Sequence, residues 1–467
     1  LCAEDASTRK TYIAYMKWYS AVGASNGCAL WKHGEYGYML SRKSGTRNFP
    51  VASLAIDERQ RVVEQRELAG NITALSVLDR EFHDIQKAGF DIVALDLLPI
   101  PPSFQNKVGN TPGCGLGALS FFGERASLFG LKTVLLSDVM NRSGDFPEGV
   151  HMTYDDWVSI YKGYIDIGYH NEWYYKKEGR PVIFQFGTTT GSMNKETGSS
   201  AVEKWKSLHR YLLGSGSSAH YYLDLRPGVL DYGNEYTGAF IFAPGAPQGF
   251  LNSVYERLLN INKDIVWTVS PGYYNQRLNV FIPPDFSRIH RGYVSAIENG
   301  AKSLLFISWN DYDEDTDISN SINKSDSLVW LVGFYNKWFK SREVPVLNAP
   351  VLIVAAPERI PLKVTSRAPS WIKAGHKYGE EFSFGRAFYW VYAPKETTLR
   401  VSGIGDLSIP SGISYGEFHF GGASSFTVSL EGLSGQLVFD IARTELESQR
   451  KGTGGLEYKY QRLGEGK

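Results

Sequence analysis

Short apolar segments alternate with helical segments from residue 11 to residue 341, and this repeat constrains the fold more than any other feature. Segment 11–20 is rich in aromatic and β-branched residues, which favour strands. A helical stripe of apolar residues then leads to Gly89, and a continuous apolar run follows it. The same unit recurs along the chain. We expect strands over 11–20, 90–98, 131–136, 180–186, 220–225, 238–243, 264–270 and 304–307.

Helical segments lie between most of these strands. They cover 78–89, 118–129, 154–167, 201–213, 254–260 and 289–299, with a closing helix over 327–339. Strands that alternate with helices form a parallel sheet, and eight such units close into a barrel. The sequence therefore predicts the α/β class and a (β/α)8 TIM barrel.

The composition changes near Val344. Residues 349–444 alternate apolar and polar side chains between Gly, Ser and Pro, a pattern typical of a β-sandwich. The stretch 446–467 is charged and rich in glycine, which is typical of poorly ordered chain ends. We predict a catalytic barrel over 1–345, a C-terminal all-β sandwich-like domain over 346–446 and a flexible charged tail over 447–467.

The charge balance bears on the class of partner. The chain has 49 basic and 49 acidic residues, whereas nucleic-acid-binding proteins usually have a basic surplus. No apolar run approaches the ~18 residues of a transmembrane helix. Aromatic residues make up 14% of the chain, and their flat faces stack on sugar rings but also fill cores. We expect no nucleic-acid partner and no membrane span.

Three features bear on the compartment. The sequence starts at Leu1–Cys2 without Met, so we expect a processed or trimmed N-terminus. Cys28 and Cys114 could pair in an oxidising compartment, but the sequence does not show that they meet. Three Asn-X-Ser/Thr sequons would be usable in a eukaryotic secretory host. We predict a secreted or cell-surface/periplasmic protein.

The eighth apolar run is followed at once by an indole and a cluster of acids. Segment 303–317 has the sequence SLLFISWNDYDEDTD. In a (β/α)8 barrel, catalytic groups lie at the C-terminal ends of the strands. Asp311 and Glu314 are close enough in sequence for one tight turn to aim both into one cleft. A pair of carboxylates in a sugar-sized cleft is the equipment for cleaving a glycosidic bond.

This stretch has two other interpretations. An acidic run is usually a solvated loop, but such a loop would not need Trp309 beside the acids. The alternate acids also resemble a calcium loop. That loop requires Gly at its sixth position and Glu at its twelfth, where this chain has Thr316 and Ile322. We therefore favour the catalytic interpretation.

Further polar and aromatic residues fall at the expected strand tips, where they would line the same cleft. The alternative for the aspartates is capping of the following helices, and for the aromatic residues it is core packing. The candidate substrate-binding residues are Trp18, Asp96, Asp138, Asp224, Arg226, Tyr273, Trp309, Asn310 and Asp313.

The sequence offers little support for other chemistries. No two of the nine histidines have the spacing of a zinc site. Segment 412–416 matches G-x-S-x-G, but no helix is expected after it, so we interpret it as a turn and not as a nucleophile elbow. No phosphate-binding glycine loop occurs. We predict no metal and no cofactor, and a polysaccharide or oligosaccharide as substrate.

Segment 308–314, S-W-N-D-Y-D-E, resembles the W-N-D-Y-G-E segment of glycoside hydrolase family 71, the α-1,3-glucanases. Family 99, the endo-α-mannosidases, has a related N-E-W-H-E segment at this place. Segments 88–95, 179–182, 270–273, 388–390 and 401–403 also resemble family 71, so the similarity covers nearly the whole chain. The chain departs from the family at Asp313, where family 71 has Gly, and at Asp315, where it has Ser. Such extra carboxylates would raise the pKa values of their neighbours.

The resemblance implies cleavage of an α-linked polysaccharide, with Glu314 as the general acid and Asp311 as the base that activates water. Similarity to family 71 implies inversion of configuration, and similarity to family 99 implies retention through a sugar 2-OH. The alternatives are an α-mannan-acting hydrolase and a non-catalytic carbohydrate-binding barrel. The presence of both acids counts against the second alternative.

Overall fold

The computed structural model describes most of the chain. The described residues are 9–16, 72–97, 115–139, 153–187, 198–224, 236–246, 248–260, 263–275, 280–311, 315–321, 324–361, 373–374, 385–444 and 458–465. No helix in these ranges is long and apolar enough to span a membrane.

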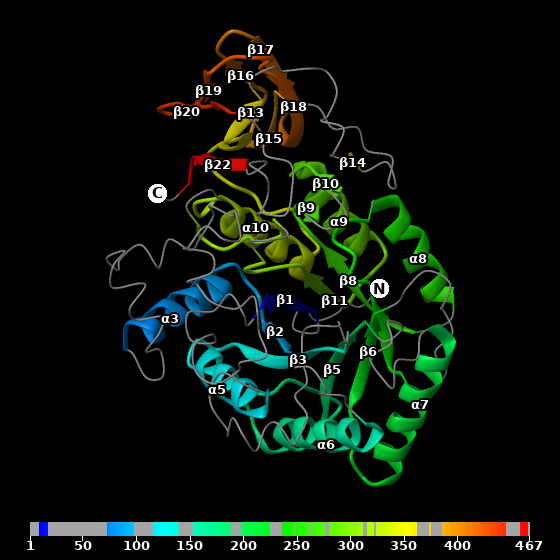
Figure 1. Ribbon diagram of the computed structural model, residues 1–467. Coiled ribbons are helices and arrows are strands. Elements are labelled where there is room, and N and C mark those ends of the chain that lie inside the picture. The colour runs from blue at the N-terminus through cyan, green and yellow to red at the C-terminus, as the bar shows by residue number, and fades with distance from the viewer. Residues whose placement is uncertain are drawn as a thin grey trace.

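Eight parallel strands close into a barrel, which confirms the predicted fold (Figure 1). Hydrogen bonds between β1 and β11 and between β3 and β5 complete the circle. The two-residue strand β4 (Lys176–Lys177) adds an antiparallel hairpin to β5. The barrel strands are β1 (Lys10–Met16), β2 (Ile92–Leu97), β3 (Lys132–Asp138), β5 (Arg180–Phe186), β6 (His220–Asp224), β7 (Gly238–Phe240), β8 (Asp264–Val269) and β11 (Ser303–Phe306).

Helices surround this barrel on the outside (Figure 1). They pack by apolar faces, as Trp157, Tyr161 and Ile165 of α6 show. Helix α6 begins with a capping box in which Thr153 and Asp156 satisfy each other's backbone N–H groups. The helices are α3 (Ile72–Lys87), α5 (Gly115–Ser127), α6 (Tyr154–His170), α7 (Gly198–Gly214), α8 (Gln248–Asn260), α9 (Phe286–Glu298) and α10 (Ser327–Ser341).

Aromatic side chains fill the barrel interior. The rings of Tyr12 on β1 and Phe184 on β5 meet across the barrel with centroids 5.2 Å apart. Phe184 also contacts Tyr222 on β6 at 5.3 Å and Phe240 on β7 at 5.1 Å. The interior is therefore a packed core, and chemistry is confined to the ends of the strands.

The C-terminal part is all-β and antiparallel. One sheet has the order β18-β15-β12-β22 and the other β17-β16-β19-β20. The strands are β12 (Val351–Pro357), β15 (Arg386–Ala393), β16 (Thr397–Val401), β17 (Gly405–Ile409), β18 (Gly412–His419), β19 (Ser425–Leu430), β20 (Leu437–Asp440) and β22 (Tyr458–Leu463). Short strands β13 (Arg359–Pro361) and β21 (Ala442–Thr444) pair with each other.

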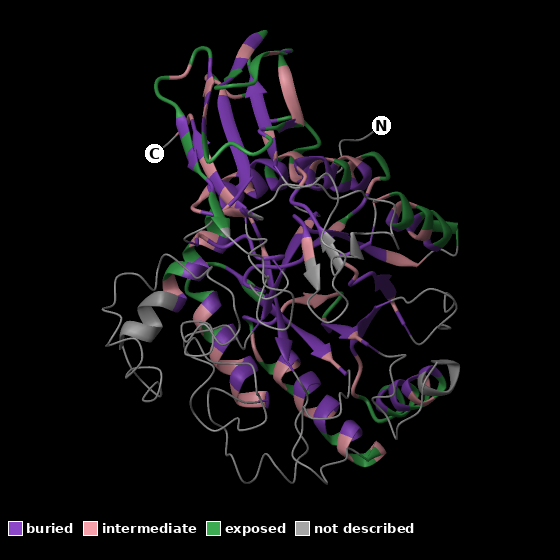
Figure 2. Cartoon of the chain, turned by 45° about the horizontal axis from the view of Figure 1, so that its top comes forward, coloured by how far each residue is buried: buried purple, intermediate pink, exposed green. Residues whose placement is uncertain are grey.

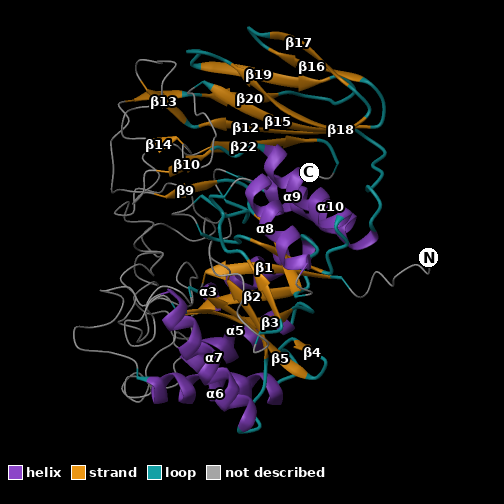
Figure 3. Cartoon of the chain, turned by 90° about the vertical axis from the view of Figure 1, so that its right-hand side faces the viewer, coloured by secondary structure: helices purple, strands orange, loops and turns teal. Residues whose placement is uncertain are grey.

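Strand β12 joins the two parts of the molecule because all of its residues are buried. Figure 2 shows that buried strands run through both the barrel and the C-terminal part. Val351 and Ile353 belong to the barrel's hydrophobic core, whereas Leu352 and Val354 belong to a separate core among the C-terminal strands. Figure 3 shows the C-terminal sheets stacked over α9 and α10. Trp390 on β15 donates a hydrogen bond to Tyr335 Oη of α10 at 3.0 Å, so the contact is polar as well as apolar.

Two predictions for the C-terminal part are wrong. The predicted tail, 447–467, contains strand β22, which pairs antiparallel with β12. Tyr458 and Tyr460 are buried there, because alternate apolar side chains suffice for a strand even where lysine and arginine intervene. The G-x-S-x-G segment is not a turn either, since it begins strand β18.

A small sheet follows β8 and links it to the C-terminal part. It consists of β9 (Tyr273–Asn275), β10 (Val280–Ile282) and β14 (Lys373–Ala374). Strands β9 and β10 are antiparallel, and β14 pairs parallel with β10. A strand from beyond β12 thus pairs with the chain that follows β8, the seventh strand of the barrel.

The buried His209 of α7 predicts an acid-sensitive fold. Its Nε2 lies 2.9 Å from Gln185 Oε1 on β5, and burial lowers the pKa of His209 to about 3. An unfolded histidine titrates near 6.5, so between these values the unfolded chain binds more protons and stability falls as the pH drops. The expected loss is about 1.4 kcal/mol per pH unit below about 6.5.

Replacement of His209 by glutamine should therefore flatten the pH dependence. We expect the wild-type chain to lose about 2 kcal/mol more unfolding free energy than His209→Gln between pH 7 and pH 5. Urea unfolding at several pH values measures this, with the exposed His83→Gln as the matched control. Parallel pH profiles for wild type and His209→Gln would contradict the assignment.

Candidate active site

The chain after β11 forms a closed loop at the C-terminal end of the barrel. The Ile307–Ser308 peptide bond is cis. Ser308 N–H donates to Thr316 O at 3.0 Å, and Thr316 N–H donates to Asp311 O at 3.2 Å. Asp311 N–H in turn donates to Ser308 Oγ at 2.9 Å. The predicted base, Asp311, therefore begins a turn whose two ends are joined by hydrogen bonds.

Asn310 connects this loop to the first strand of the barrel. Its Oδ1 accepts from Met16 N–H at 2.7 Å, and its Nδ2 donates to Met16 O at 3.0 Å. Trp309 N–H donates to Ala14 O at 2.8 Å. Asn310 has no exposed surface, so its amide is occupied in holding β1 against the loop. This contact is structural, in contrast to the predicted substrate-binding role.

Trp309 is also buried, with 1% of its surface exposed. Its backbone carbonyl accepts from Ile318 and Ser319, which anchors the return of the loop. A buried indole offers no open face to a sugar ring, so the prediction of Trp309 as a sugar platform is wrong. The indole packs beneath the loop because an apolar ring gains more from the core than from solvent.

Tyr273 is partly exposed and begins β9, shortly after the end of β8. A Cβ atom built on Gly245 would lie 2.7 Å from Tyr273 Cδ1, so the ring rests directly on the backbone of the loop after β7. Only glycine permits this approach. Tyr273 remains a candidate for stacking on substrate.

The three aspartates at strand tips share one orientation. Met16 pairs in register with Asp96, and Asp96 with Leu136 on β3, two residues before Asp138. Side chains alternate along a strand, so Asp96 and Asp138 lie on the inward face that Tyr12 shares. Asp224 stands at the tip of β6, where its Oδ1 accepts from Phe242 N–H at 2.8 Å and thus fixes the chain after β7.

The structure brings seven predicted residues to one end of the barrel: Asp96, Asp138, Asp224, Tyr273, Trp309, Asn310 and Asp311. Trp18, Arg226, Asp313 and the predicted general acid Glu314 lie outside the described residues, as do Cys28 and Cys114. In the described ranges, no three His, Cys, Asp or Glu side chains cluster so as to hold a metal ion.

The acidic run contains an ion-pair cluster that the sequence analysis missed. Lys324 Nζ lies 2.9 Å from Asp315 Oδ1 and 2.7 Å from Asp317 Oδ1. Burial raises the pKa of Asp317 to about 6, and Asp315 adds to this effect while Lys324 opposes it. Burial also acts against the Lys324 ammonium, but the two carboxylates outweigh it and raise the pKa of Lys324. The only sequence signal was a single lysine shortly after the acids.

Arg288 on α9 is a second residue that the sequence analysis missed. Its Nη2 donates to Ala246 O at 2.7 Å and to Pro244 O, and its Nε donates to Ser270 Oγ at 3.3 Å. One buried guanidinium thus joins the chain after β7 to the chain after β8. This contact fixes the loop on which Tyr273 rests.

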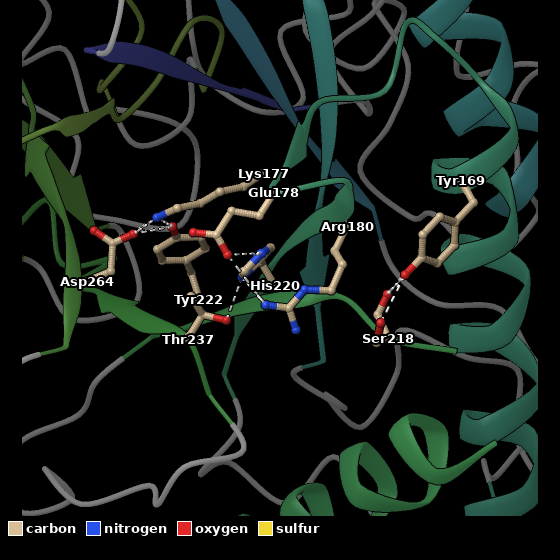
Figure 4. A network of polar contacts seen from close by, with 9 residues as sticks. All are labelled: Tyr169, Lys177, Glu178, Arg180, Ser218, His220, Tyr222, Thr237 and Asp264. Atoms are coloured by element: carbon tan, nitrogen blue, oxygen red, sulfur yellow. Dashed lines mark hydrogen bonds and ion pairs between the residues drawn. The ribbon is translucent and has the colours of Figure 1, made fainter. Parts of the chain in front are cut away.

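A separate polar network lies where β5, β6 and β8 begin, at the opposite end of the barrel (Figure 4). Asp264 accepts hydrogen bonds from Lys177 and, at 2.5 Å, from Tyr222 Oη. His220 Nδ1 lies 3.0 Å from Thr237 Oγ1. Burial lowers the pKa of His220, with a contribution from Arg180. Polar groups at this end of a TIM barrel serve stability, not catalysis.

The change Asp264→Asn should therefore affect stability alone. Lys177 and Tyr222 would lose a charged acceptor, and we expect the unfolding free energy to fall by about 1–3 kcal/mol with activity unchanged. Urea unfolding measures the effect. Glu172→Gln, which removes an exposed ion pair with Lys176, is the control and should change stability by less than about 1 kcal/mol. A large loss of turnover in Asp264→Asn would contradict this role.

No protein-family model matches the chain, nor does any curated protein. Among solved structures, the chain is similar to a GH99 endo-α-mannosidase from Bacteroides thetaiotaomicron, with 13% identity and a TM-score of 0.49 over 71% of this chain and 98% of that one. It is also similar to an endo-β-1,4-mannanase from Thermotoga petrophila, with 12% identity and a TM-score of 0.40 over 79% and 94% of the two chains. A glycoside hydrolase-like protein shares 11% identity, with a TM-score of 0.47 over 70% of this chain and 93% of that one. At such identities the likeness concerns the fold.

Proposed function

We propose that the chain is a glycoside hydrolase that cleaves an α-linked polysaccharide, with α-1,3-glucan as the first candidate substrate. One observation carries the proposal. The segment that resembles the family 71 motif follows the last strand of a closed barrel, and its first acid, Asp311, begins a turn tied at both ends. Catalytic residues of TIM-barrel enzymes occupy this position.

The proposed mechanism uses two carboxyl groups. Glu314 donates a proton to the glycosidic oxygen as the bond to the anomeric carbon breaks. Asp311 accepts a proton from the water molecule that attacks this carbon from the opposite side. The sugar configuration is then inverted. Neither step requires a metal or cofactor.

The motif departs from that of family 71 at two positions, so the identity of the substrate needs its own test. Asp313 and Asp315 replace small residues of the family motif. Asp315, however, is paired with Lys324, so the ammonium group compensates its charge. This pairing supports a glucanase-like site, and α-mannan remains the second candidate. A polymeric substrate of either kind also supports the proposal of a secreted or cell-surface/periplasmic location.

Reducing-sugar release from a panel of α-glucans and α-mannans tests the proposal. We expect the largest release of reducing sugar from α-1,3-glucan. Because the proposed mechanism inverts the configuration, NMR during the first turnovers should show new reducing ends in the β configuration. Release from α-mannan alone would replace the glucanase by the mannan-acting alternative. Binding of a polysaccharide without release from any polymer would favour a non-catalytic carbohydrate-binding barrel.

A further inference from the structure

The ammonium group of Lys324 is enclosed almost completely by the loop that follows the eighth barrel strand. The lysine side chain is 1% exposed, and the side chains of Asp315 and Asp317 are 9% and 0% exposed. Besides the two carboxylates, Nζ donates to Asp317 O at 2.8 Å. A buried charge is tolerated only when it is paired, so lysine and aspartates depend on each other for their positions.

The two aspartates flank the residue that closes the catalytic turn. Thr316 lies between them, and its N–H donates to Asp311 O while its carbonyl accepts from Ser308 N–H. Thr316 Oγ1 also lies 2.9 Å from Ser308 Oγ, the atom that accepts from Asp311 N–H. Lys324 therefore holds the returning side of the turn on both sides of Thr316, and Thr316 holds Asp311.

The C-terminal strand β22 covers Lys324 from the other side. Nζ lies 5.9 Å from the centre of the Tyr460 ring, and Ser325 Oγ donates to Tyr460 O at 3.3 Å. Arg462 Nη2 pairs with Asp326 Oδ2 at 2.7 Å. Three consecutive residues, 324–326, thus contact one strand that comes from the end of the chain.

We propose that Lys324 is a positioning residue for the general base Asp311, and that β22 completes its enclosure. This proposal rests on the proposed function. The ammonium group holds the side chains of Asp315 and Asp317 in place, and these two residues hold Thr316 between them. Thr316 in turn positions the backbone of Asp311, whose carboxylate contacts the attacking water. The all-β part of the chain thereby contributes to catalysis without touching the substrate.

Lys324→Met tests the proposal, with Lys340→Met as the matched control. Lys340 makes similar contacts at the other end of the barrel, to Asp91 Oδ1 and Gly89 O, both at 2.7 Å. We expect Lys324→Met to lower kcat on the cleaved polysaccharide by on the order of 10²-fold, the cost of a misplaced catalytic group, with little change in KM. Amide hydrogen exchange in 308–319 should accelerate. Lys340→Met should change neither quantity.

A milder variant covers the case in which Lys324→Met does not fold. Asp315→Asn leaves the pair between Lys324 and Asp317 in place, and it should lower kcat by a smaller factor while exchange in 308–319 still accelerates. Lys324→Arg keeps the charge and should recover part of the turnover lost in Lys324→Met.

The outcomes separate this proposal from the proposed function. Unchanged kcat in folded Lys324→Met or in Asp315→Asn, or unchanged exchange in 308–319, would overturn the positioning role even if thermal stability falls. A wild-type chain that cleaves no polysaccharide of the panel contradicts the proposed function instead. In that event the exchange comparison with Lys340→Met alone decides whether Lys324 orders the loop.

Discussion

Glu314→Gln is expected to lower kcat on the cleaved polysaccharide by roughly 10²–10⁴-fold, because glutamine cannot donate the proton that the leaving oxygen needs. Asp311→Asn should cause a loss of the same order, because the amide cannot accept a proton from water. Reducing-sugar release measures both variants. Glu298→Gln makes the same chemical change on the exposed surface of α9 and serves as the control.

The leaving group distinguishes the two roles. In an aryl glycoside with an acidic phenol, the phenolate leaves without being protonated. Glu314→Gln should therefore retain far more activity on this substrate than on the polysaccharide. Asp311→Asn should remain impaired on both, since the attack of water still lacks its base. Equal losses of Glu314→Gln on the two substrates would remove Glu314 as the acid. Polysaccharide cleavage that survives this change would direct attention to Asp313.

Removal of β22 should cause the largest loss of stability. A chain that ends at residue 457 loses the buried side chains of Tyr458, Tyr460 and Leu463 and leaves one edge of β12 unpaired. Burial of a large apolar side chain contributes about 1.5–3 kcal/mol, so we expect a loss of about 5 kcal/mol or more. The exposed edge should also promote aggregation.

A chain that ends at residue 465 is the matched control, because it keeps the whole of β22. Urea unfolding followed by tryptophan fluorescence, together with light scattering, compares the two truncated chains with the full one. Equal stability of the chain ending at 457 and the control would show that β22 contributes little to the fold, and it would also weaken the proposed enclosure of Lys324.

The barrel could be predicted from the sequence because its signals are local. An apolar run such as 180–186 needs no information about its neighbours to be recognised as a strand, and β5 has these bounds. The predicted strand 238–243 extends beyond β7, which ends at Phe240. Beyond this point Phe242 N–H donates to the Asp224 carboxylate, a contact between distant residues that a local sequence pattern does not encode.

The features that were missed depend on contacts between distant residues. The sequence of β22 looks polar until β12, about a hundred residues earlier, is placed beside it. The sequence shows Asp315 only as an extra carboxylate, whereas the structure pairs both Asp315 and Asp317 with Lys324. Trp309 and Asn310 are conspicuous in the motif, yet burial and hydrogen bonding assign them to the scaffold.

The contact between Asn310 and Met16 joins positions 294 residues apart, where the last strand of the barrel meets the first. Such a closure comes late in folding, since contacts between residues distant in sequence require the longest loop to be ordered first. We therefore expect the first seven strands to assemble before the seam between β1 and β11 closes. The loop that begins at Asp311 lies on this seam, so under the proposed function we expect cleavage only from chains whose barrel has closed.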